Sequence, residues 1–451
     1  MNVLHVPFTY YPDACGGTEV YVAALAREQR RLGMKVAVAA PGEQDAAYEH
    51  EGVPVYRFST GRGGLTLREL YGEGNAEARA GFERIVEQTA PDIVHLHALT
   101  AAVSLGVARA AKRRGARVVF TYHTPTVTCQ RGTLLRWGRQ VCDGVMAVRR
   151  CAACVMEGQG APRLVSLALS AVPERVGEAL GRAGLAGGLW TALRMTELVS
   201  LRHRTARALL AEADGVIAVS EWVRDLLVRD GVDPAKIVLS RQGLGTVSAA
   251  PVKAERPAGA PLRVIFLGRL SRVKGVHLLL EALRRAPDLA VALDVYGIVQ
   301  DEEGRRIEAE IRRAADRRIR LLPPVPPGEV VATIAGYDVL AAPSQWLESG
   351  PLVVYEAFAA GVPVLGSRLG GITELVTDGV DGLLVPHASA EGWTAALRRL
   401  AGEQDLRKRL RCGIRPPRTM EKAAQEASRL YEEVLRAAGP RKGLDVSPAS
   451  C

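Results

Sequence analysis

Short apolar runs, rich in β-branched residues, alternate with amphipathic helical stretches along the whole chain. This alternation predicts parallel β-sheets that are covered by helices. In the first half of the chain the expected strands are residues 2–6, 36–40, 92–96, 118–122 and 215–220. In the second half they are residues 263–267, 293–296, 339–342, 362–366 and 383–385.

The chain is long for one hydrophobic core, because single cores stop growing near about 250 to 300 residues. Its 451 residues therefore predict two domains. Residues 246–261, TVSAAPVKAERPAGAP, are rich in Ala and Pro without a clear period, and we interpret them as the linker. We expect an α/β, Rossmann-like domain over residues 1–247 and a second one over residues 262–418. A helix over 419–437 should pack back toward the first domain, and residues 438–451 should form a disordered tail.

Composition narrows the class of protein. Hydrophobic residues make up 48% and charged residues 24% of the chain, which is ordinary for a soluble globular protein. The net charge of +10 favours anionic partners such as phosphorylated substrates or acidic lipid headgroups. Acidic and basic residues are interspersed and only 5% of residues are aromatic, so we expect no nucleic-acid partner.

The chain starts MNVLHVPFTYYPD, without the features of a signal peptide, and has no apolar stretch of about 18 residues that could span a membrane. We expect a cytoplasmic protein, and peripheral contact with the inner face of the membrane stays open. Residues 163–213 form a helical, insertion-like region with repeated Gly and Arg. We interpret it as helices that cover the N-terminal sheet; the alternative is a basic amphipathic surface for a membrane or a lipid-linked acceptor.

The strongest chemical signal begins at Ser344, where the sequence reads SQWLESGPLVVYEAFAAGVPVLGS. A strand end and a loop are followed by a predicted helix start at Gly350, Pro351 and Leu352. The unpaired N–H groups of a helix N-terminus suit a phosphate group. Glu348 lies just before this helix and Glu356 about one and a half turns inside it, so their carboxylates can bind hydroxyls on the two sides of a diphosphate.

A second signal follows the predicted strand 263–267, where the chain reads GRLSRVKG. Gly268, Arg269 and Lys274 then lie in the loop at the carboxyl end of a strand, where open α/β sheets bind ligands. Arg can form two hydrogen bonds to phosphate oxygens and Lys adds a compact charge, so the pair can stabilise a departing diphosphate.

These motifs, together with GGTE at 16–19, YHT around His123, GVPVLGS and GGITELV, resemble the retaining family 4 glycosyltransferases of the GT-B fold, in order and over nearly the whole chain. The resemblance implies two Rossmann-like domains that face each other across a cleft. It also implies a nucleotide-sugar donor, which we expect to be a UDP-, GDP- or ADP-sugar, and a sugar or lipid-linked acceptor. The transfer would retain the anomeric configuration and use no catalytic metal or other cofactor. It would be a step in the synthesis of a glycan, a polysaccharide or a glycolipid.

The same resemblance implies residue roles. Gly16 and Gly17 would approach the diphosphate across the cleft, His123 would lie near the donor sugar, and Glu348 and Glu356 would bind the sugar and the ribose. The expected catalytic residues are thus His123, Arg269, Lys274 and Glu348, and the expected donor-binding residues are Gly16, Gly17, Gly268, Gly350, Pro351, Leu352 and Glu356. The chain departs from the family at Val299, where the second glycine of a Gly-x-Gly usually stands, and in the prolines of 321–327. These departures leave the base of the donor unassigned.

Two groups of possible metal ligands stand outside these motifs. His95 and His97 alternate on a predicted strand among apolar residues, and we interpret them as strand residues rather than ligands. Cys129, Cys142, Cys151 and Cys154 have the spacing C-x12-C-x8-C-x2-C in a loop-like segment after His123. This cluster predicts a structural four-thiolate site, with zinc ahead of an iron–sulfur cluster; four unligated or disulfide-prone cysteines are the alternative.

Two other functions remain open from the sequence. Sugar-nucleotide epimerases share the GT-B fold, but GRLSRVKG and the pair of glutamates match the transferases better. A non-catalytic donor-binding scaffold in an assembly complex is the other alternative, and the presence of both glutamates and both basic residues favours an enzyme.

Overall fold

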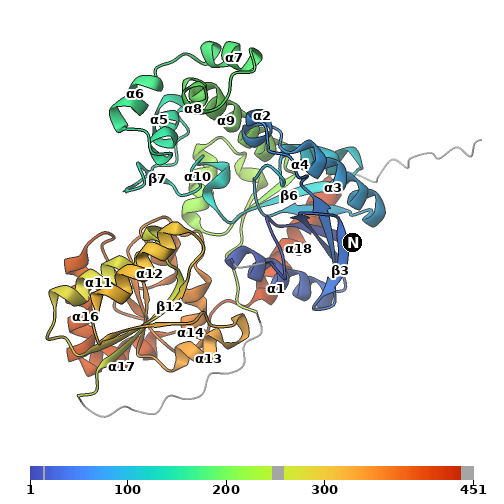
Figure 1. The fold of residues 1–451 in the computed structure, drawn as a ribbon. Coiled ribbons are helices and arrows are strands. Elements are labelled where there is room, and N and C mark those ends of the chain that lie inside the picture. The colour runs from blue at the N-terminus through green and yellow to red at the C-terminus, as the bar shows by residue number, and fades with distance from the viewer. Residues whose placement is uncertain (14–15, 246–258, 438–451) are drawn as a thin grey trace, which may run out of the picture.

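The computed structural model describes residues 1–13, 16–245 and 259–437. These residues form two α/β domains, drawn mainly in blue to green and in yellow to orange in Figure 1. Most of the predicted linker and all of the predicted tail lie outside the described residues. No helix in the described ranges combines the length and the apolar character needed to cross a membrane.

The N-terminal sheet has the order β10-β9-β6-β5-β1-β2-β4-β3, and only β3 runs antiparallel to its neighbour. Its strands are β1 (Asn2–Val6), β2 (Lys35–Gly42), β3 (Ala46–His50), β4 (Val53–Ser59), β5 (Ile93–Leu96), β6 (Arg117–Tyr122), β9 (Gly215–Ala218) and β10 (Ile237–Leu239). The five predicted strands are confirmed. The prediction missed β3, β4 and β10: β3 has no buried residue, β10 has only three residues, and Pro54 and Arg57 interrupt the apolar positions of β4.

The C-terminal sheet is fully parallel in the order β13-β12-β11-β14-β15-β16. Its strands are β11 (Leu262–Arg269), β12 (Val291–Ile298), β13 (Ile319–Leu322), β14 (Val339–Ala342), β15 (Val364–Ser367) and β16 (Gly382–Val385). Strands β14, β15 and β16 are buried at every position, as expected where helices cover both faces. The edge strand β13 was not predicted, since the prolines that follow it favoured a loop.

Helices cover both faces of each sheet and bury two apolar clusters per domain. In the N-terminal half they are α1 (Gly17–Arg31), α2 (Leu67–Tyr71), α3 (Ala76–Thr89), α4 (Leu105–Arg113), α5 (Val148–Gly158), α6 (Arg163–Leu169), α7 (Glu174–Arg182), α8 (Gly188–Leu193), α9 (Met195–Glu212) and α10 (Glu221–Arg229). In the C-terminal half they are α11 (Val276–Arg285), α12 (Glu302–Ala314), α13 (Val330–Ala335), α14 (Leu352–Ala359), α15 (Gly370–Leu375), α16 (Ala390–Gly402), α17 (Gln404–Gly413) and α18 (Met420–Ala437).

The last helix, α18, belongs to the core of the N-terminal domain. Its buried face packs against α1 and the strands β6 and β9, and the hydroxyl of Tyr431 lies 2.6 Å from Nδ1 of His95. The chain therefore crosses between the domains twice, and the two crossings touch at a bridge between Leu244 and Thr419. A Cβ on Gly243 would stand 2.2 Å from the carbonyl oxygen of Thr419, so this close contact requires glycine.

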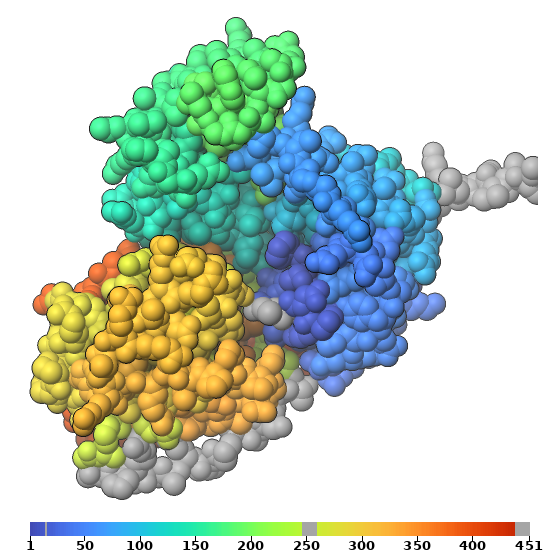
Figure 2. All heavy atoms as spheres, viewed as in Figure 1, coloured from blue at the N-terminus to red at the C-terminus, as the bar shows by residue number. Residues whose placement is uncertain are grey.

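The helical region 163–213 divides into two parts. Helix α9 buries Leu209 and Leu210 in the core of the N-terminal domain, which confirms a covering role for this helix. The shorter helices α6, α7 and α8 instead pack on α5 and α9 and project from the domain, at the top of Figures 1 and 2. For these three the covering prediction is wrong, because their apolar side chains are largely exposed.

Candidate active site

The predicted site residues lie where the two domains meet. The loop after β6 carries His123, and the loop between β14 and α14 carries Glu348 and Ser349. The Ser349 hydroxyl donates a hydrogen bond to the backbone oxygen of His123, and the indole N–H of Trp222 donates to the backbone oxygen of Glu348 at 2.9 Å. The loops at the carboxyl ends of β6 and β14, one from each sheet, are thus in direct contact across the domain interface.

A second contact fixes the domains beside this point. The carboxylate of Glu374, on α15, accepts hydrogen bonds from the backbone N–H groups of Glu221 at 2.8 Å and Trp222 at 2.9 Å. It therefore caps α10 of the opposite domain, where the helix dipole favours an anion. Arg241 adds an ion pair with Glu374 at 3.3 Å.

Lys274 and Glu348 form an ion pair at the centre of the site. The Nζ atom of Lys274 donates to Oε1 of Glu348 at 2.7 Å, and the Ser344 hydroxyl donates to the same oxygen at 2.6 Å. Burial by itself raises the pKa of Glu348, but the charge and the hydrogen bond of Lys274, with that of Ser344, hold the pKa below its usual value. Glu348 is buried, whereas the Lys274 side chain is 24% exposed, so the ammonium group lies between the buried carboxylate and the solvent.

The loop that carries Lys274 is shaped by a glycine. Gly275 has φ +79, and a Cβ there would lie 1.8 Å from the carbonyl oxygen of Pro343. Only glycine allows this approach, which places the loop beside the β14–α14 loop. Arg269, at the end of β11, is exposed and donates to Gln300 at 3.3 Å, and Gly268 precedes it within the strand.

Glu356 lies on α14, five residues after Pro351, which caps the helix. In the described part of the chain its carboxylate has no hydrogen-bond or ion-pair partner. Burial raises its pKa to about 7. Glu356 is partly exposed, so a ligand can reach its carboxylate, and hydroxyl donors from that ligand would stabilise it.

The start of α1 lies opposite the start of α14. Gly16 is the N-cap of α1, and a Cβ on Gly17 would lie 3.5 Å from Cδ1 of Leu352 across the interface. A Cβ on Gly350 would lie 3.0 Å from the side-chain oxygen of Gln242. The glycines therefore permit the two helix starts and the Gln242 side chain to approach closely.

A row of buried histidines runs from His123 into the N-terminal domain. Nε2 of His123 lies 3.0 Å from Nδ1 of His97, and Nε2 of His97 lies 2.9 Å from Nδ1 of His5. The row ends at Gln29, whose side-chain oxygen lies 2.7 Å from Nε2 of His5. Burial lowers the pKa of His123 to about 3, and it lowers the pKa of His5 to about 4 against the raising effect of the Gln29 hydrogen bond.

The neutral state of this row fixes which nitrogen carries each proton. Gln29 donates its amide to Tyr431 at 3.2 Å and so presents its oxygen to His5, which must donate from Nε2. His5 then accepts at Nδ1 from His97, and His97 accepts at Nδ1 from His123. Nδ1 of His123 is left as an acceptor.

Sequence reasoning missed Gln29 and His5, and also Gln242. The amide nitrogen of Gln242 lies 3.5 Å from Nδ1 of His123, and its buried side-chain oxygen has no hydrogen-bond partner in the described residues. An orphaned buried oxygen beside His123 indicates a place for a ligand donor. A histidine at the end of each of three predicted strands was the available signal for the row.

His5, His95 and His97 also place three ring nitrogens within 4.8 Å of one another. Each of these rings already has hydrogen-bond partners at both nitrogens, and His95 bonds to Tyr431 and to the Thr121 hydroxyl, each at 2.6 Å. This arrangement supports the interpretation of His95 and His97 as strand residues.

The four cysteines lie beyond the site, toward the projecting helices. Cys129 and Cys142 lie in turns, whereas Cys151 and Cys154 lie on α5, so the prediction of a loop-like segment is wrong for this second pair. All four are free thiols.

Family models match both halves of the chain. One described as glycosyl transferase 4-like domain matches residues 16–243, and one described as glycosyl transferases group 1 matches residues 252–415. Among curated relatives, the D-inositol 3-phosphate glycosyltransferase of Nocardia farcinica (strain IFM 10152) is 34% identical over 220 residues, which are 45% of this chain and 48% of that protein. The enzyme of the same name from Corynebacterium glutamicum (strain R) is 31% identical over 256 residues, 52% and 60% of the two chains. The chain thus spans about half the length of the curated relatives it matches.

Solved structures with the same fold cover nearly the whole chain. Sucrose-phosphate synthase from Thermosynechococcus elongatus has a TM-score of 0.65 at 19% identity and covers 97% of this chain and 99% of its own. HepE of Anabaena in complex with UDP-glucose has a TM-score of 0.59 at 16% identity, with 97% and 99% covered. A putative UDP-N-acetylglucosamine 2-epimerase from Listeria monocytogenes has a TM-score of 0.52 at 13% identity, with 96% of each chain covered. These likenesses confirm the predicted GT-B fold and, at such identities, show the fold alone.

Proposed function

This chain belongs to the glycosyl transferase 4-like family, and we propose that it transfers a sugar from a nucleotide-sugar donor to an acceptor hydroxyl with retention of the anomeric configuration. The observation that carries the proposal is the ion pair of the partly exposed Lys274 and the buried Glu348, held at 2.7 Å beside the backbone of His123. Lys274 supplies a cation for a diphosphate, and the adjacent Glu348 supplies a carboxylate for sugar hydroxyls. A nucleotide sugar needs both groups side by side, because its sugar and its diphosphate are directly bonded.

The donor provides hydrogen-bond and ion-pair partners for the polar side chains of the site. Lys274 and the exposed Arg269 bind the diphosphate, and Glu356 accepts hydrogen bonds from the ribose hydroxyls. Glu348, oriented by Ser344, binds the sugar hydroxyls. Gly16 and Gly17 leave room for the donor between α1 and α14. HepE of Anabaena was crystallised with UDP-glucose, and this supports a nucleoside-diphosphate sugar as donor here as well.

The reaction breaks the bond between the anomeric carbon and the diphosphate oxygen, and the electron pair leaves with the diphosphate. Lys274 and Arg269 stabilise the negative charge that develops on this group, so no catalytic metal is needed for that purpose. An acceptor hydroxyl attacks the oxocarbenium-like sugar on the face that the diphosphate leaves. Its proton passes to an oxygen of the departing phosphate, and Glu348 does not act as a nucleophile.

His123 acts as a hydrogen-bond acceptor for the donor sugar. His5 and His97 are positioning residues, because they hold the His123 ring with its Nε2 proton directed away from the domain interface. Nδ1 then accepts a hydrogen bond from a sugar hydroxyl, and the ring stays neutral. The buried oxygen of Gln242 adds a second acceptor nearby.

The acceptor binds from the N-terminal domain, and the projecting helices bring the enzyme to a membrane surface. Helices α6 and α8 expose large apolar side chains, with Leu164 81% and Leu189 63% exposed, and Trp190 beside Leu189 is 42% exposed. Amphipathic helices of this kind bury their apolar face at the boundary of headgroups and acyl chains. Flotation with anionic lipid vesicles tests this: the parent should float, and a Leu164→Ser/Leu189→Ser variant should stay at the bottom.

The test of the transfer is product analysis by NMR with a defined donor and a panel of sugar and lipid-linked acceptors. We expect a glycoside with the anomeric configuration of the donor, and Glu348→Ala should remove it while nucleoside diphosphate still binds. An inverted product would contradict the retaining mechanism. Release of an epimerised sugar without acceptor would identify an epimerase, and donor binding without any turnover would identify a scaffold.

A further inference from the structure

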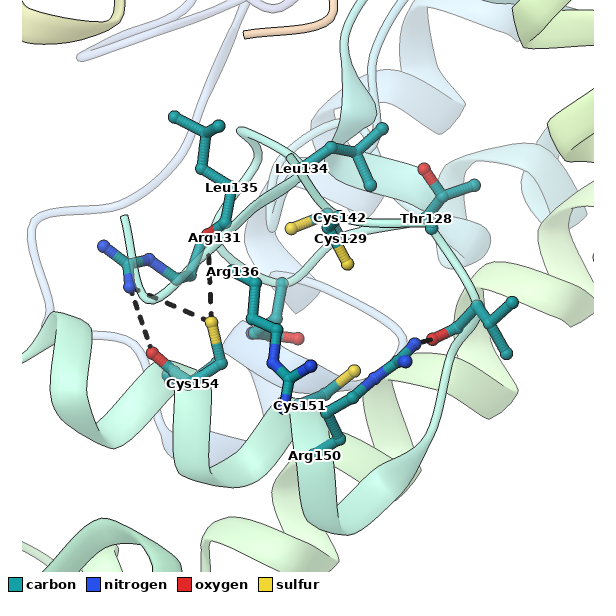
Figure 3. Close-up of a pocket in the computed structure, with 14 residues that line it drawn as sticks. Thr128, Cys129, Arg131, Leu134, Leu135, Arg136, Cys142, Arg150, Cys151 and Cys154 are labelled. Carbon is teal, nitrogen blue, oxygen red and sulfur yellow. Dashed lines mark hydrogen bonds between the residues drawn. The ribbon is translucent and has the colours of Figure 1, made fainter. Parts of the chain in front are cut away.

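A pocket lined by four cysteines lies between the hairpin of β7 (Leu135–Arg136) and β8 (Gln140–Val141) and the helix α5 (Figure 3). Cys129 follows the turn Pro125–Val127, and Cys142 follows β8. Cys151 and Cys154 are one helical turn apart on α5, so they share a face. Figure 3 shows their sulfur atoms around one space, and the proposed transfer reaction uses none of them.

The backbone of this segment is strained at Leu134 and Trp137, although both side chains are buried. The two strands of the hairpin have two residues each, and so small a hairpin is marginal by itself. Leu134 and Trp137 adopt positive φ values of 50 and 57, which cost free energy in residues other than glycine. Such a conformation persists only when a surrounding interaction fixes it.

Hydrogen-bond donors and cations surround the sulfur atoms. The backbone N–H of Trp137 donates to Sγ of Cys154 at 3.3 Å, and Nη1 of Arg131 lies 3.9 Å from the same sulfur. Arg136 and Arg150 also line the pocket. The thiol of Cys154 is also directed to the carbonyl oxygen of Leu135 at 3.9 Å, and its proton leaves when the sulfur binds a metal.

The size and charge of the pocket suit a small inorganic group. The cavity measures about 30 Å³, which leaves room for an ion rather than an organic substrate. Four thiolates around a divalent cation carry a net charge of about −2, and the three arginines of the lining lie where they offset it.

We propose that Cys129, Cys142, Cys151 and Cys154 bind a thiophilic metal, as a zinc ion or an iron–sulfur cluster, at a structural site. In the described residues no three of these sulfurs lie within 4.8 Å of one another, so binding draws them inward by side-chain rotation. A site closed by four thiolates keeps no open position and takes no part in the transfer chemistry.

A metal at this site would join the turn, the hairpin and α5, which already meet through the hydrogen bonds of Arg131 and Trp137 to Cys154. The N–H of Cys129 bonds to the carbonyl of Pro125 at 2.7 Å, and the hydroxyl of Thr128 lies 2.7 Å from that of Tyr122, at the end of β6. The site thereby fixes the chain that follows His123 and the base of the projecting helices α6 to α8.

Metal analysis of the full chain, purified anaerobically without chelators, tests the proposal. We expect about one zinc, or the iron and sulfide of one cluster with its visible absorbance, per chain. The Cys151→Ser/Cys154→Ser variant should retain less than about one tenth of this metal. Cys412→Ser is the matched control, because Cys412 is exposed on α17, and it should keep the full amount.

A second measurement, on the parent protein, tests the site even if the Cys151→Ser/Cys154→Ser variant does not fold. Cobalt(II) titrated into metal-stripped parent protein should give the intense bands of a tetrahedral tetrathiolate site and should protect four thiols from a thiol reagent. Parent protein that is metal-free as purified, binds no cobalt and shows all four thiols reactive would overturn the proposal. None of these readouts depends on transferase activity.

Discussion

Lys274 is paired with the buried Glu348 at 2.7 Å, and this has a direct consequence for the proposed catalysis. An ammonium group held in place by an ion pair needs little reorganisation to meet a diphosphate, and we expect it to stabilise the charge that increases there in the transition state. Arg269 is exposed and only weakly held by Gln300, so it gains order on donor binding.

Replacing either cation should therefore lower turnover more than it lowers stability. We expect Lys274→Ala and Arg269→Ala each to reduce kcat by about 100-fold or more, the range for a lost preorganised electrostatic contact. Donor turnover measured at saturation checks this, with thermal unfolding as the test of fold. Arg285→Ala, an exposed arginine on α11, is the control and should leave kcat unchanged. Near-parental turnover in both site variants would show that Lys274 and Arg269 do not stabilise the departing diphosphate.

The buried histidine row has a consequence for stability against pH. Burial holds the pKa of His5 at about 4 and that of His123 at about 3, and those of His95 and His97 well below the usual value. The unfolded chain binds protons at these histidines as pH falls below about 6.5, whereas the folded chain does not until about pH 4. The free energy of unfolding should therefore decrease as pH falls from about 6.5 to about 4. The decrease should be up to about 1.4 kcal/mol per pH unit for each of these histidines.

Denaturant unfolding at about pH 7 and about pH 5 measures this loss. His5→Gln should reduce the pH dependence by about one histidine's share, and His387→Gln, at an exposed position, should leave it as in the parent. Equal pH dependence in all three proteins would contradict a neutral, buried His5.

At the scale of elements, loops at the carboxyl ends of β6, β11 and β14 assemble the site, and their shape depends on backbone contacts that glycine permits. Gly275 is the sharpest case, because the space for its Cβ is occupied by the carbonyl oxygen of Pro343 at 1.8 Å. Gly361 also has a positive φ, of 66, but nothing lies within 4 Å of its Cβ position.

This pair separates steric overlap from backbone strain. Gly361→Ala should cost about 1 kcal/mol of unfolding free energy, the price of a positive φ alone. Gly275→Ala should cost at least about 3 kcal/mol, and it should displace Lys274 enough to lower donor turnover. Urea unfolding and turnover of the two variants check this; equal losses would show that the contact with Pro343 does not shape the loop.

Elements also show what the sequence could and could not predict. Strands buried on both faces, such as β5 and β14, stand out as apolar runs, and the spacing of Lys274, Glu348 and Glu356 indicated a donor site. The contact between His5 and His97 depends on the order of β1, β5 and β6 in the sheet, which local pattern does not contain. Likewise, Gln242 follows β10 and His123 follows β6, and their contact depends on the sheet order β10-β9-β6.

At the scale of the whole molecule, each domain supplies what the other lacks. The C-terminal domain holds Lys274, Glu348 and Glu356, and the N-terminal domain brings His123 and the start of α1 against them. Glu374 and α18 fix this arrangement from two sides, since Glu374 caps α10 and α18 joins the N-terminal core. We therefore expect the donor to bind between the domains and to stabilise both.

Thermal unfolding with a panel of UDP-, GDP- and ADP-sugars tests this central claim most directly. A donor at a hundredfold excess over its Kd should stabilise the folded parent by about 2.7 kcal/mol, and sugars on one base should do so above the others. Glu356→Ala should lose most of this protection, because the ribose loses its acceptor. Protection by none of the nucleotide sugars, or equal protection of the parent and Glu356→Ala, would contradict the donor site described above.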